Sequence, residues 1–523
     1  MISPDSNGLY HPTSEKDVID LINYAITNKL QVRVRGAAQS VSSAVYTDNY
    51  PPAAGGASAN INMELDQLRS ISFDDATMQA TVGAGMNLGT DPYDPSGMSQ
   101  KSASNNLLEN LNAHGWSVQN VPDVIHQTIA GYISTGSQAG SMMHSFDDCI
   151  VAIRLVDGTG TPQTFTKSDD LENHFYAVGV SMGLLGIITS VTLQCVPAFN
   201  IIGQEMISSQ VDCEFDFLGN GGADKKSLQD YVTDTEFSRT LWWPFPTLKR
   251  VIAWKAKTMQ PSDYNNETTG TATDFTPKPY QPVFPKIFGS TMTARTVAGT
   301  GFRLIANYPQ WLYDILGNNP ELKKYEGILD TIAPYLYPFM INLYFPVSSD
   351  EHPVQKFWDY WNRSLPMDTI EFSDNLFNLV YTEMWVSISD ANKAVNALND
   401  FYQKQGMSLV SYYTVEILAT KKSNFWMSPA YNGDVIRFNI MRFDTNKTND
   451  LTYYQQFWDW MKSQEISFTL HWGKYLPPPN SGEGAGYLTG QYPKWNDFKT
   501  LRSQMDPNNI FLTSYWKSQL GIN

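Results

Sequence analysis

Cysteine is scarce in this chain, and its spacing is irregular. Cys149, Cys195 and Cys213 are the three cysteines among 523 residues, and no Cys-x-x-Cys pair occurs. This pattern excludes a disulfide framework and the usual cysteine-ligated zinc site. The histidines are scattered without the spacing of metal ligands, so we expect buried thiols and no metal centre.

Positive charge is also in short supply. The chain has 36 Lys and Arg residues against 52 Asp and Glu residues, which gives a formal net charge of −16. No basic run of useful length offsets this excess of negative charge. An acidic surface repels phosphate backbones and anionic headgroups. We therefore expect neither a nucleic acid nor an anionic membrane as partner.

Long hydrophobic runs are missing as well. The longest uncharged stretch, residues 331–349, contains three prolines and an asparagine, which disrupt a spanning helix. The first residues, MISPDSNGLYHPT, lack the features of a secretory signal, although a trimmed secreted protein would look the same. We expect a soluble protein without a transmembrane segment, either cytoplasmic or secreted, and the sequence leaves its oligomeric state open.

What the chain does contain indicates an α+β fold with more than one domain. A length of 523 residues exceeds what one hydrophobic core usually organises. Short β-rich runs alternate with Gly/Ser turns over residues 1–199, whereas residues 200–465 are richer in aromatics and proline. The last segment, 466–523, returns to compact turns.

Several individual elements can be predicted from periodicity and capping signals. We expect helices at 14–28, 107–116, around 355–365 and at 391–405, and strands around 239–246 and 435–443. Asp147 and Asp148 are interpreted as a solvated turn. Trp242, Trp243 and the aromatic residues of 325–350 are assigned mainly to the core, with some of them expected at a substrate cavity.

A turn of small residues follows a short strand near the N-terminus. In VRVRGAAQSVSSA, residues 32–44, Gly36, Ala37 and Ala38 follow alternating valines and arginines. Such residues let backbone N–H groups approach a phosphate, although a surface turn has the same composition. A second Gly/Ser-rich stretch lies at 128–160, and an apolar stretch at 179–197 has Gly183 and Gly186 just before a β-rich run. Together these runs suggest a dinucleotide held by loops between strands, without the helix N-terminus of a Rossmann fold.

Five motifs follow one another in the order found in the FAD domain of the vanillyl-alcohol-oxidase family. They are RVRGAAQS, NMELDQLRSISFDDATMQATVGAGMNLG, TIAGYISTGSQAG, VAIRLVDGTG and GLLGIITSVTLQ. Further along, EFSRTLWWPFPTLKRVIAWKAK, VEILATKKSNFWMSPAY, LHWGKY and DPNNIFLTSYW resemble the aldonolactone and alditol oxidase branch. The apolar, aromatic region 258–405 is more similar to class II cholesterol oxidases, and RGAAQ resembles the RGAxH turn of that group.

The resemblance implies a fold, a domain order and a cofactor. Residues 1–199 would form a two-subdomain, PCMH-type FAD-binding domain, and 200–465 a substrate domain with an antiparallel sheet and covering helices. Residues 466–523 would return to the FAD domain. The residues that would contact FAD are Arg35, Gly36, Ala37, Ala38, Gln39, Ser40, Pro122, Thr128, Gly131, Ser134, Gly136, Ser137, Gly186, Ile187, Ile188, His471 and Lys474.

The same resemblance bears on how FAD is attached. In many relatives the last residue of the first turn is a histidine bonded covalently to the flavin, whereas Gln39 stands here. Gln138 occupies the place in the second loop where another histidine often occurs. Because an amide cannot attack the flavin methyl group, we expect FAD to be held noncovalently.

Alcohol oxidation needs an acceptor for the hydroxyl proton and a positive charge near the flavin. Glu416 lies in the apolar strand YYTVEILATK, where an unpartnered carboxylate would be costly, and the resemblance places it where relatives carry an active-site glutamate. The family match also implies that Lys474 of LHWGKY lies near the flavin or the substrate oxygen, with His471 and Trp472 beside the ring.

The chain departs from its relatives around this glutamate. They usually have Glu-x-Arg, but Leu418 stands at the arginine position, and Asn439 stands where sugar-oxidising relatives carry a histidine. Arg437, on the same strand face as Asn439, is a candidate replacement, with a solvent-exposed strand arginine as an equal alternative. Loss of these polar groups favours a mostly apolar alcohol over a polyol.

We therefore expect an FAD-dependent oxidase that converts a CH–OH group of a bulky, mostly apolar, sterol-like alcohol to a carbonyl. Molecular oxygen would be the acceptor and hydrogen peroxide the second product. A sugar or aldonolactone oxidase is one alternative. A flavin-bound protein without redox chemistry, serving as a binding or cyclisation template, is the other.

Overall fold

The computed structural model describes most of the chain. The described residues are 2–51, 60–91, 105–245, 248–265, 268–281, 338–339, 341–342, 345–366, 379–405, 414–443 and 450–522. The aromatic segment 325–350, some of which we expected at the substrate cavity, falls mostly outside these residues.

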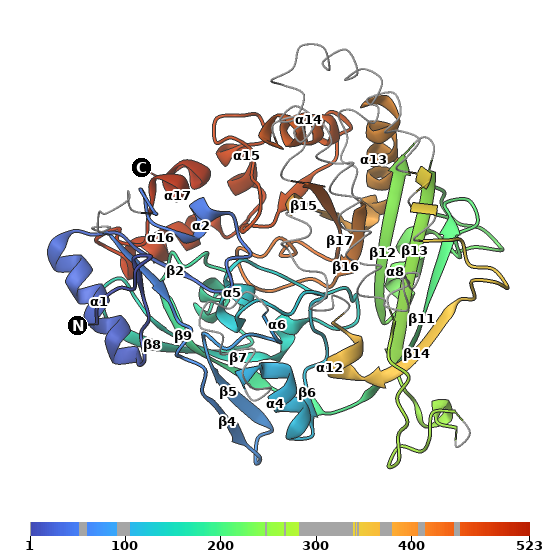
Figure 1. The fold of residues 1–523 in the computed structure, drawn as a ribbon. Coiled ribbons are helices and arrows are strands. Elements are labelled where there is room, and N and C mark those ends of the chain that lie inside the picture. Colours follow the sequence, from blue (N-terminus) through green and yellow to red (C-terminus); the bar gives the residue numbers. More distant parts are fainter. Residues whose placement is uncertain are drawn as a thin grey trace, which may run out of the picture.

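A three-stranded parallel sheet lies at the N-terminal end of the chain (Figure 1). Its strand order is β1 (Leu9–Tyr10), β3 (Ile61–Glu64) and β2 (Val32–Arg35), and the short helix α2 (Ser42–Val45) follows β2. Helix α1 (Glu15–Asn28) begins at Ser14, which forms a capping box with Asp17. The apolar face of α1 is buried, so the helix predicted at 14–28 is confirmed.

A five-stranded antiparallel sheet forms the second layer of the N-terminal half. Its strand order is β4 (Ile71–Asp74), β5 (Gln79–Gly83), β9 (Ile187–Gln194), β7 (Ile150–Val156) and β8 (Pro162–Thr166). The remaining elements of this half are helices α4 (Leu107–Ala113), α5 (Ile129–Ser134), α6 (Phe146–Cys149) and α7 (Phe175–Val178) and the pair β6 (Trp116–Ser117) and β10 (Val196–Pro197). Helix α4 stops just before Gly115, which has a φ of 79°, as the sequence predicts.

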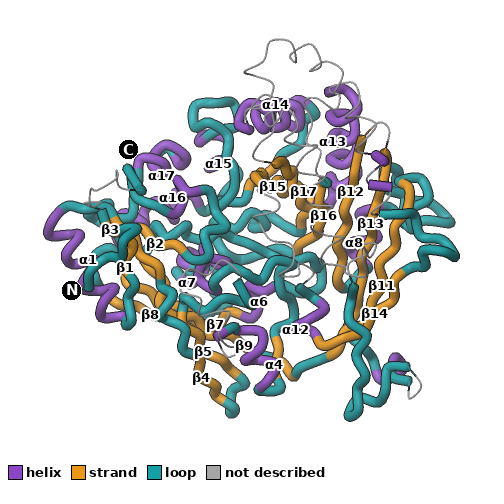
Figure 2. The backbone as a smooth tube through the Cα atoms, in the orientation of Figure 1, coloured by secondary structure: helices purple, strands orange, loops and turns teal. Residues whose placement is uncertain are grey.

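An eight-stranded antiparallel sheet dominates the second half of the chain (Figure 2). Its strand order is β14 (Gln355–Tyr360), β11 (Asn200–Ser209), β13 (Leu248–Thr258), β12 (Phe237–Phe245), β16 (Val415–Thr420), β17 (Val435–Phe443), β15 (Leu379–Ser387) and β18 (Phe468–Leu470). The described helices that accompany this sheet are α8 (Leu228–Asp234), α12 (Trp361–Ser364), α13 (Ala391–Gln405) and α14 (Asp450–Ser463), with 3-10 turns η2 (Pro261–Asp263) and η4 (Ile388–Asp390).

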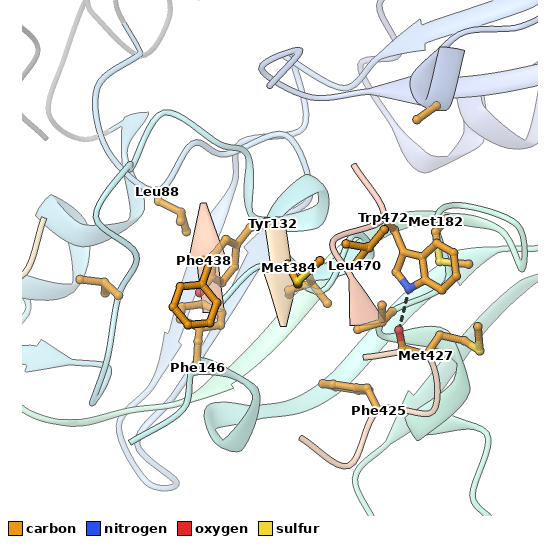
Figure 3. Packing of buried hydrophobic residues seen from close by; sticks show 14 of the residues in the cluster. Leu88, Tyr132, Phe146, Met182, Met384, Phe425, Met427, Phe438, Leu470 and Trp472 are labelled. Carbon is orange, nitrogen blue, oxygen red and sulfur yellow. Dashed lines mark hydrogen bonds between the residues drawn. The ribbon is translucent and has the colours of Figure 1, made fainter. Parts of the chain in front are cut away.

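One buried cluster joins the two halves. Tyr132 of α5 and Phe146 of α6 lie close to Phe438 of the eight-stranded sheet (Figure 3). Trp472 belongs to the same cluster and donates a hydrogen bond from Nε1 to the carbonyl of Met427 at 2.8 Å. Because this core is continuous, the two sheets hold the loops between them in fixed positions.

The last segment runs back to the N-terminal sheet (Figure 1). It carries α15 (Ala485–Gly490), α16 (Trp495–Met505) and α17 (Ser514–Leu520). The N–H of Val32 donates to the carbonyl of Ile510 at 2.7 Å, and Trp516 Nε1 donates to the carbonyl of Ala44 at 3.0 Å. The C-terminal segment therefore supports the strand and turn from which the small-residue loop begins.

Two expectations about local structure were wrong. Residues 355–360 form a strand, β14, and only the short helix α12 follows, because the backbone of β14 pairs with β11 and its side chains alternate between buried and half-buried. Asp147 is not solvated: it is buried at the start of α6, where its carboxylate accepts a hydrogen bond from Ser423.

Other expectations hold. The three cysteine thiols are free and buried. Trp242 and Trp243 are core residues, and the helix predicted at 391–405 is α13. Among the described residues, no helix has the length and apolar composition needed to cross a bilayer.

Candidate active site

Two connected cavities lie where the halves of the molecule meet. The larger has a volume of about 950 Å³ and opens over the eight-stranded sheet. The second is a narrow cleft between the turn at 35–40 and the loop at 128–137. The residues that line both are Ala38, Gln39, Ser40, Gln127, Ser137, His471 and Lys474.

Most of the predicted cofactor residues line the narrow cleft. They are Arg35, Gly36, Ala37, Ala38, Gln39, Ser40, Thr128, Gly131, Ser134, Ser137, Gly186, Ile188, His471 and Lys474. Pro122 lines the larger cavity instead. Gly136 packs against Pro429 and Val180, and Ile187 points to the opposite face of β9 from Ile188, so neither lines a cavity.

The small-residue turn packs directly against the second loop. A Cβ atom at Gly36 would clash with Oγ1 of Thr128, the N-cap of α5. Ala38 has a φ of 55°, in the left-handed region. Glycine at 36 is therefore required by the neighbouring loop, and the turn brings its backbone to the edge of the cleft.

The cleft residues fit an FAD dinucleotide. Six consecutive residues of the first turn line it, and small or hydroxyl side chains such as Ser134 and Ser137 face them. This lining leaves backbone and hydroxyl donors at the surface of the cleft, as a pyrophosphate requires. Nε of Arg35 is buried and has no hydrogen-bond partner among the described residues, so it is an available donor.

His471 and Lys474 mark the junction of the two cavities. Nδ1 of His471 accepts a hydrogen bond from the N–H of Gly473 at 3.0 Å, so Nε2 carries the proton and donates to Oγ of Ser137 at 2.8 Å. Burial lowers the pKa of His471 to about 4, which keeps the ring neutral. Nζ of Lys474 donates to the carbonyl of Gln39 at 2.7 Å and lies 4.1 Å from the ring centroid of Tyr381.

A row of polar side chains crosses the sheet beneath the larger cavity. Glu416 on β16 is the cross-strand partner of Asn439 on β17, and Asn439 is the partner of Glu383 on β15. Directly paired residues of antiparallel strands share a face, and all three side chains line the cavity. The sheet thus places the side-chain amide of Asn439 between the carboxylates of Glu416 and Glu383.

Both oxygens of the Glu416 carboxylate accept hydrogen bonds. Oε1 accepts a hydrogen bond from Nε of Arg239 on β12 at 2.5 Å, and Oε2 accepts one from Nδ2 of Asn439 at 2.6 Å. The Glu416 side chain is 7% exposed and that of Arg239 is 17% exposed. Glu416 is therefore a buried carboxylate with a fixed orientation.

Arg437 pairs with the other carboxylate. Its Nη1 donates to Oε1 of Glu383 at 3.1 Å, and both side chains are buried. Burial alone would raise the pKa of Glu383, but the nearby His471, Arg437 and Lys474 together hold that pKa below its ordinary value. Arg437 is thus neither solvent-exposed nor hydrogen-bonded to Glu416.

Two residues of this site were missed from the sequence. Glu383 lies in a strand that could have been examined by the same alternation as Glu416, but no motif singled it out. Arg239 precedes Glu416 by 177 residues, so only strand pairing reveals their contact. Among the described residues, no group of three or more His, Cys, Asp or Glu side chains is arranged to hold a metal ion.

Known proteins match different parts of the chain. Residues 7–90 match the family described as FAD binding domain, and residues 363–519 match the family described as D-arabinono-1,4-lactone oxidase. The D-arabinono-1,4-lactone oxidase of Kluyveromyces lactis is 27% identical over 259 residues, which cover 48% of this chain and 42% of that protein. The chain thus matches about two fifths of the length of this fungal relative.

Longer matches have lower identity. The L-gulonolactone oxidase of Mus musculus is 23% identical over 518 residues, covering 97% of this chain and 93% of the mouse protein. The crystal structure of cholesterol oxidase from Brevibacterium sterolicum superposes with a TM-score of 0.65 at 14% identity, covering 98% and 93% of the two chains. Together these matches support a PCMH-type FAD oxidase with likeness to the lactone oxidase branch, and they support FAD as its cofactor.

Proposed function

We propose that the protein is an FAD-dependent oxidase that converts a CH–OH group to a carbonyl, with Glu416 as the proton acceptor. The observation that carries this proposal is the buried Glu416 carboxylate, which accepts a hydrogen bond on each oxygen and lies in the cavity that shares lining residues with the narrow cleft. When bound, FAD takes a hydride from the carbinol carbon and passes the electrons to oxygen, giving hydrogen peroxide.

The residues around the cavity have separate tasks in this reaction. Glu416 accepts the hydroxyl proton, and Asn439 keeps its carboxylate aimed into the cavity. Lys474 brings a positive charge to the junction, where it offsets the negative charge that arrives with the hydride. His471, as the neutral Nε2–H tautomer, holds Ser137 of the second loop in place.

The cavity lining supports a substrate with a polar end and a bulky apolar part. Beyond the polar row, the cavity is bordered by an apolar wall of Leu241, Leu379, Met441, Leu476, Pro478 and Pro479. We propose a bulky, mostly apolar alcohol whose hydroxyl reaches Glu416. An aldonolactone is the second candidate, because Glu383 adds a further polar group to the row and the relatives named above are lactone oxidases.

The test is a visible spectrum of the purified protein followed by anaerobic addition of a sterol, a long-chain alcohol and a γ-lactone in turn. We expect a yellow protein that one of the alcohols bleaches, with peroxide formed when air returns. Bleaching by the hydroxylated lactone alone would select the second candidate. A yellow protein that no member of the series bleaches would favour the non-redox template.

A further inference from the structure

The side chain that fixes Glu416 comes from a different strand and from far away in the sequence. Arg239 lies on β12, two residues from Leu241, which is the cross-strand partner of Glu416. Side chains two residues apart share a face of a strand, so Arg239 and Leu241 both line the larger cavity. This placement brings the guanidinium to Oε1 of Glu416 at 2.5 Å.

Arg239 also contacts the loop that borders the cofactor cleft. Its Nε lies 3.9 Å from Oδ2 of Asp123, and the side chain of Asp123 is 8% exposed. Asp123 and Gln127 belong to one loop, and Gln127 lines both the cavity and the cleft. Arg239 therefore links the strand that carries Glu416 to the part of the chain that borders the cofactor.

The other guanidinium in the cavity is engaged elsewhere. Arg437 is bonded to Glu383 and its guanidinium carbon lies 5.4 Å from the ring centroid of Trp385. Its interaction with Glu416 is electrostatic, without a hydrogen bond between the two side chains. The direct ion pair of Glu416 is therefore with Arg239.

We propose that Arg239 is a positioning residue, which acts through Glu416 by holding its carboxylate aimed at the reacting hydroxyl. The proposal rests on the alcohol oxidation proposed above. The fixed planar donors of an arginine restrict the rotation of a carboxylate that they contact. With Asn439 on the second oxygen, the carboxylate presents its remaining lone pairs to the cavity in one orientation.

Other titratable groups face this pair. They are Asp123 and His126 from the loop at 122–127, Arg437 from β17, Glu383 from β15, Glu205 from β11, and His471 and Lys474 at the junction. Because Asp123 also contacts Arg239, the effect of removing the guanidinium has to be measured on Glu416 itself.

The test follows the Glu416 carboxylate directly in the FAD-loaded protein without substrate. Infrared difference spectra are recorded at one fixed pH, and the carboxylate stretching bands of Glu416 are identified by their loss in Glu416→Gln. We expect Arg239→Gln to shift these bands, because Oε1 loses its charge-assisted hydrogen bond. In Arg239→Lys kcat should fall roughly tenfold, because the ammonium lacks the planar donors.

Arg154→Gln is the control, because it removes an arginine that is also ion-paired, with Glu15 at 2.7 Å, and that lines neither cavity. It should change neither the Glu416 bands nor kcat. Unshifted bands in Arg239→Gln would overturn the proposal, and so would a wild-type kcat in Arg239→Lys if Arg239→Gln does not fold. A wild-type protein that oxidises no alcohol would instead count against the proposed function, since the infrared measurement needs no turnover.

Discussion

At the scale of single residues, the proposed chemistry depends on how Glu416 is held. Burial of a carboxylate is unfavourable unless its oxygens accept hydrogen bonds. Here Arg239 and Asn439 each donate a hydrogen bond to one oxygen of Glu416. The same two donors that make the burial tolerable also fix the direction of the carboxylate. A group that must accept a proton from one hydroxyl benefits from such preorganisation.

The first prediction concerns this carboxylate. Glu416→Gln keeps the shape of the side chain but removes the proton acceptor, so we expect kcat to fall by about 10²- to 10⁴-fold while FAD stays bound. Stopped-flow measurement of flavin reduction, with the visible spectrum as a check on FAD content, tests this. Glu214→Gln, which removes a half-buried carboxylate paired with Lys255 elsewhere in the chain, is the control and should react at the wild-type rate. Unchanged flavin reduction in Glu416→Gln would contradict the assignment.

The sequence indicated Glu416, Arg437, Asn439 and Lys474 as catalytic candidates, and all four line the larger cavity, but it did not indicate the pairing among them. Alternation along a strand tells which side chains share a face. It does not tell which strand lies alongside, and the partner of Glu416 is 177 residues away. For that reason Arg437, the nearby candidate for the missing guanidinium, was considered, while Arg239 was not.

At the scale of elements, the antiparallel pairing of three strands creates the site. β16, β17 and β15 contribute Glu416, Asn439 and Glu383 to a single row, because each pair is in direct register. A one-residue slip of any of these strands would turn its polar side chain to the other face of the sheet. The register is maintained by apolar neighbours such as Ile417 and Phe438, which are buried.

The second prediction concerns Asp147 in the short helix α6. Burial raises the pKa of Asp147 to about 6, although the hydrogen bond from Ser423 lowers it in part. The unfolded chain releases this proton near pH 4. Since the unfolded state loses the proton first, the free energy of unfolding should fall by roughly 2 to 3 kcal/mol as pH rises from about 4 to about 6, and then level off.

Asp147→Asn should remove this pH dependence and stabilise the protein at pH 7, because an amide oxygen can still accept the hydrogen bond from Ser423. Urea unfolding at pH 4, 5, 6 and 7 measures the effect. Asp148→Asn, at the exposed neighbour paired with Lys421, is the control and should leave the slope as in wild type. Equal slopes for Asp147→Asn and wild type would contradict the prediction.

At the scale of the whole molecule, the C-terminal segment supports both ends of the site. The chain at 471–474 borders the two cavities, and the chain at 510–516 bonds to β2 and to the end of α2. The N–H of Val41 also donates to the carbonyl of Gly473 at 2.9 Å. The small-residue turn is therefore held by two segments that follow it by more than 400 residues in the sequence.

The third prediction concerns the attachment of FAD. Gln39 lines both cavities and Gln138 lines the larger one, and neither amide can form a bond to the flavin. We expect acid precipitation to release all FAD into the supernatant, measured by its absorbance. In Gln39→His part of the flavin should stay with the precipitate. Complete release from this variant would place residue 39 away from the flavin ring.

The sequence by itself determined the local features of this protein. Helix α1 follows from its capping box and apolar stripe, the small-residue turn from its composition, and the FAD domain from the order of five motifs, because each of these signals lies within a short stretch of chain. Only the tertiary structure decided which strands are neighbours. It brought Arg239 to Glu416, paired Arg437 with Glu383, buried Asp147 and made residues 355–360 a strand, because these outcomes depend on contacts between distant segments that no local pattern encodes.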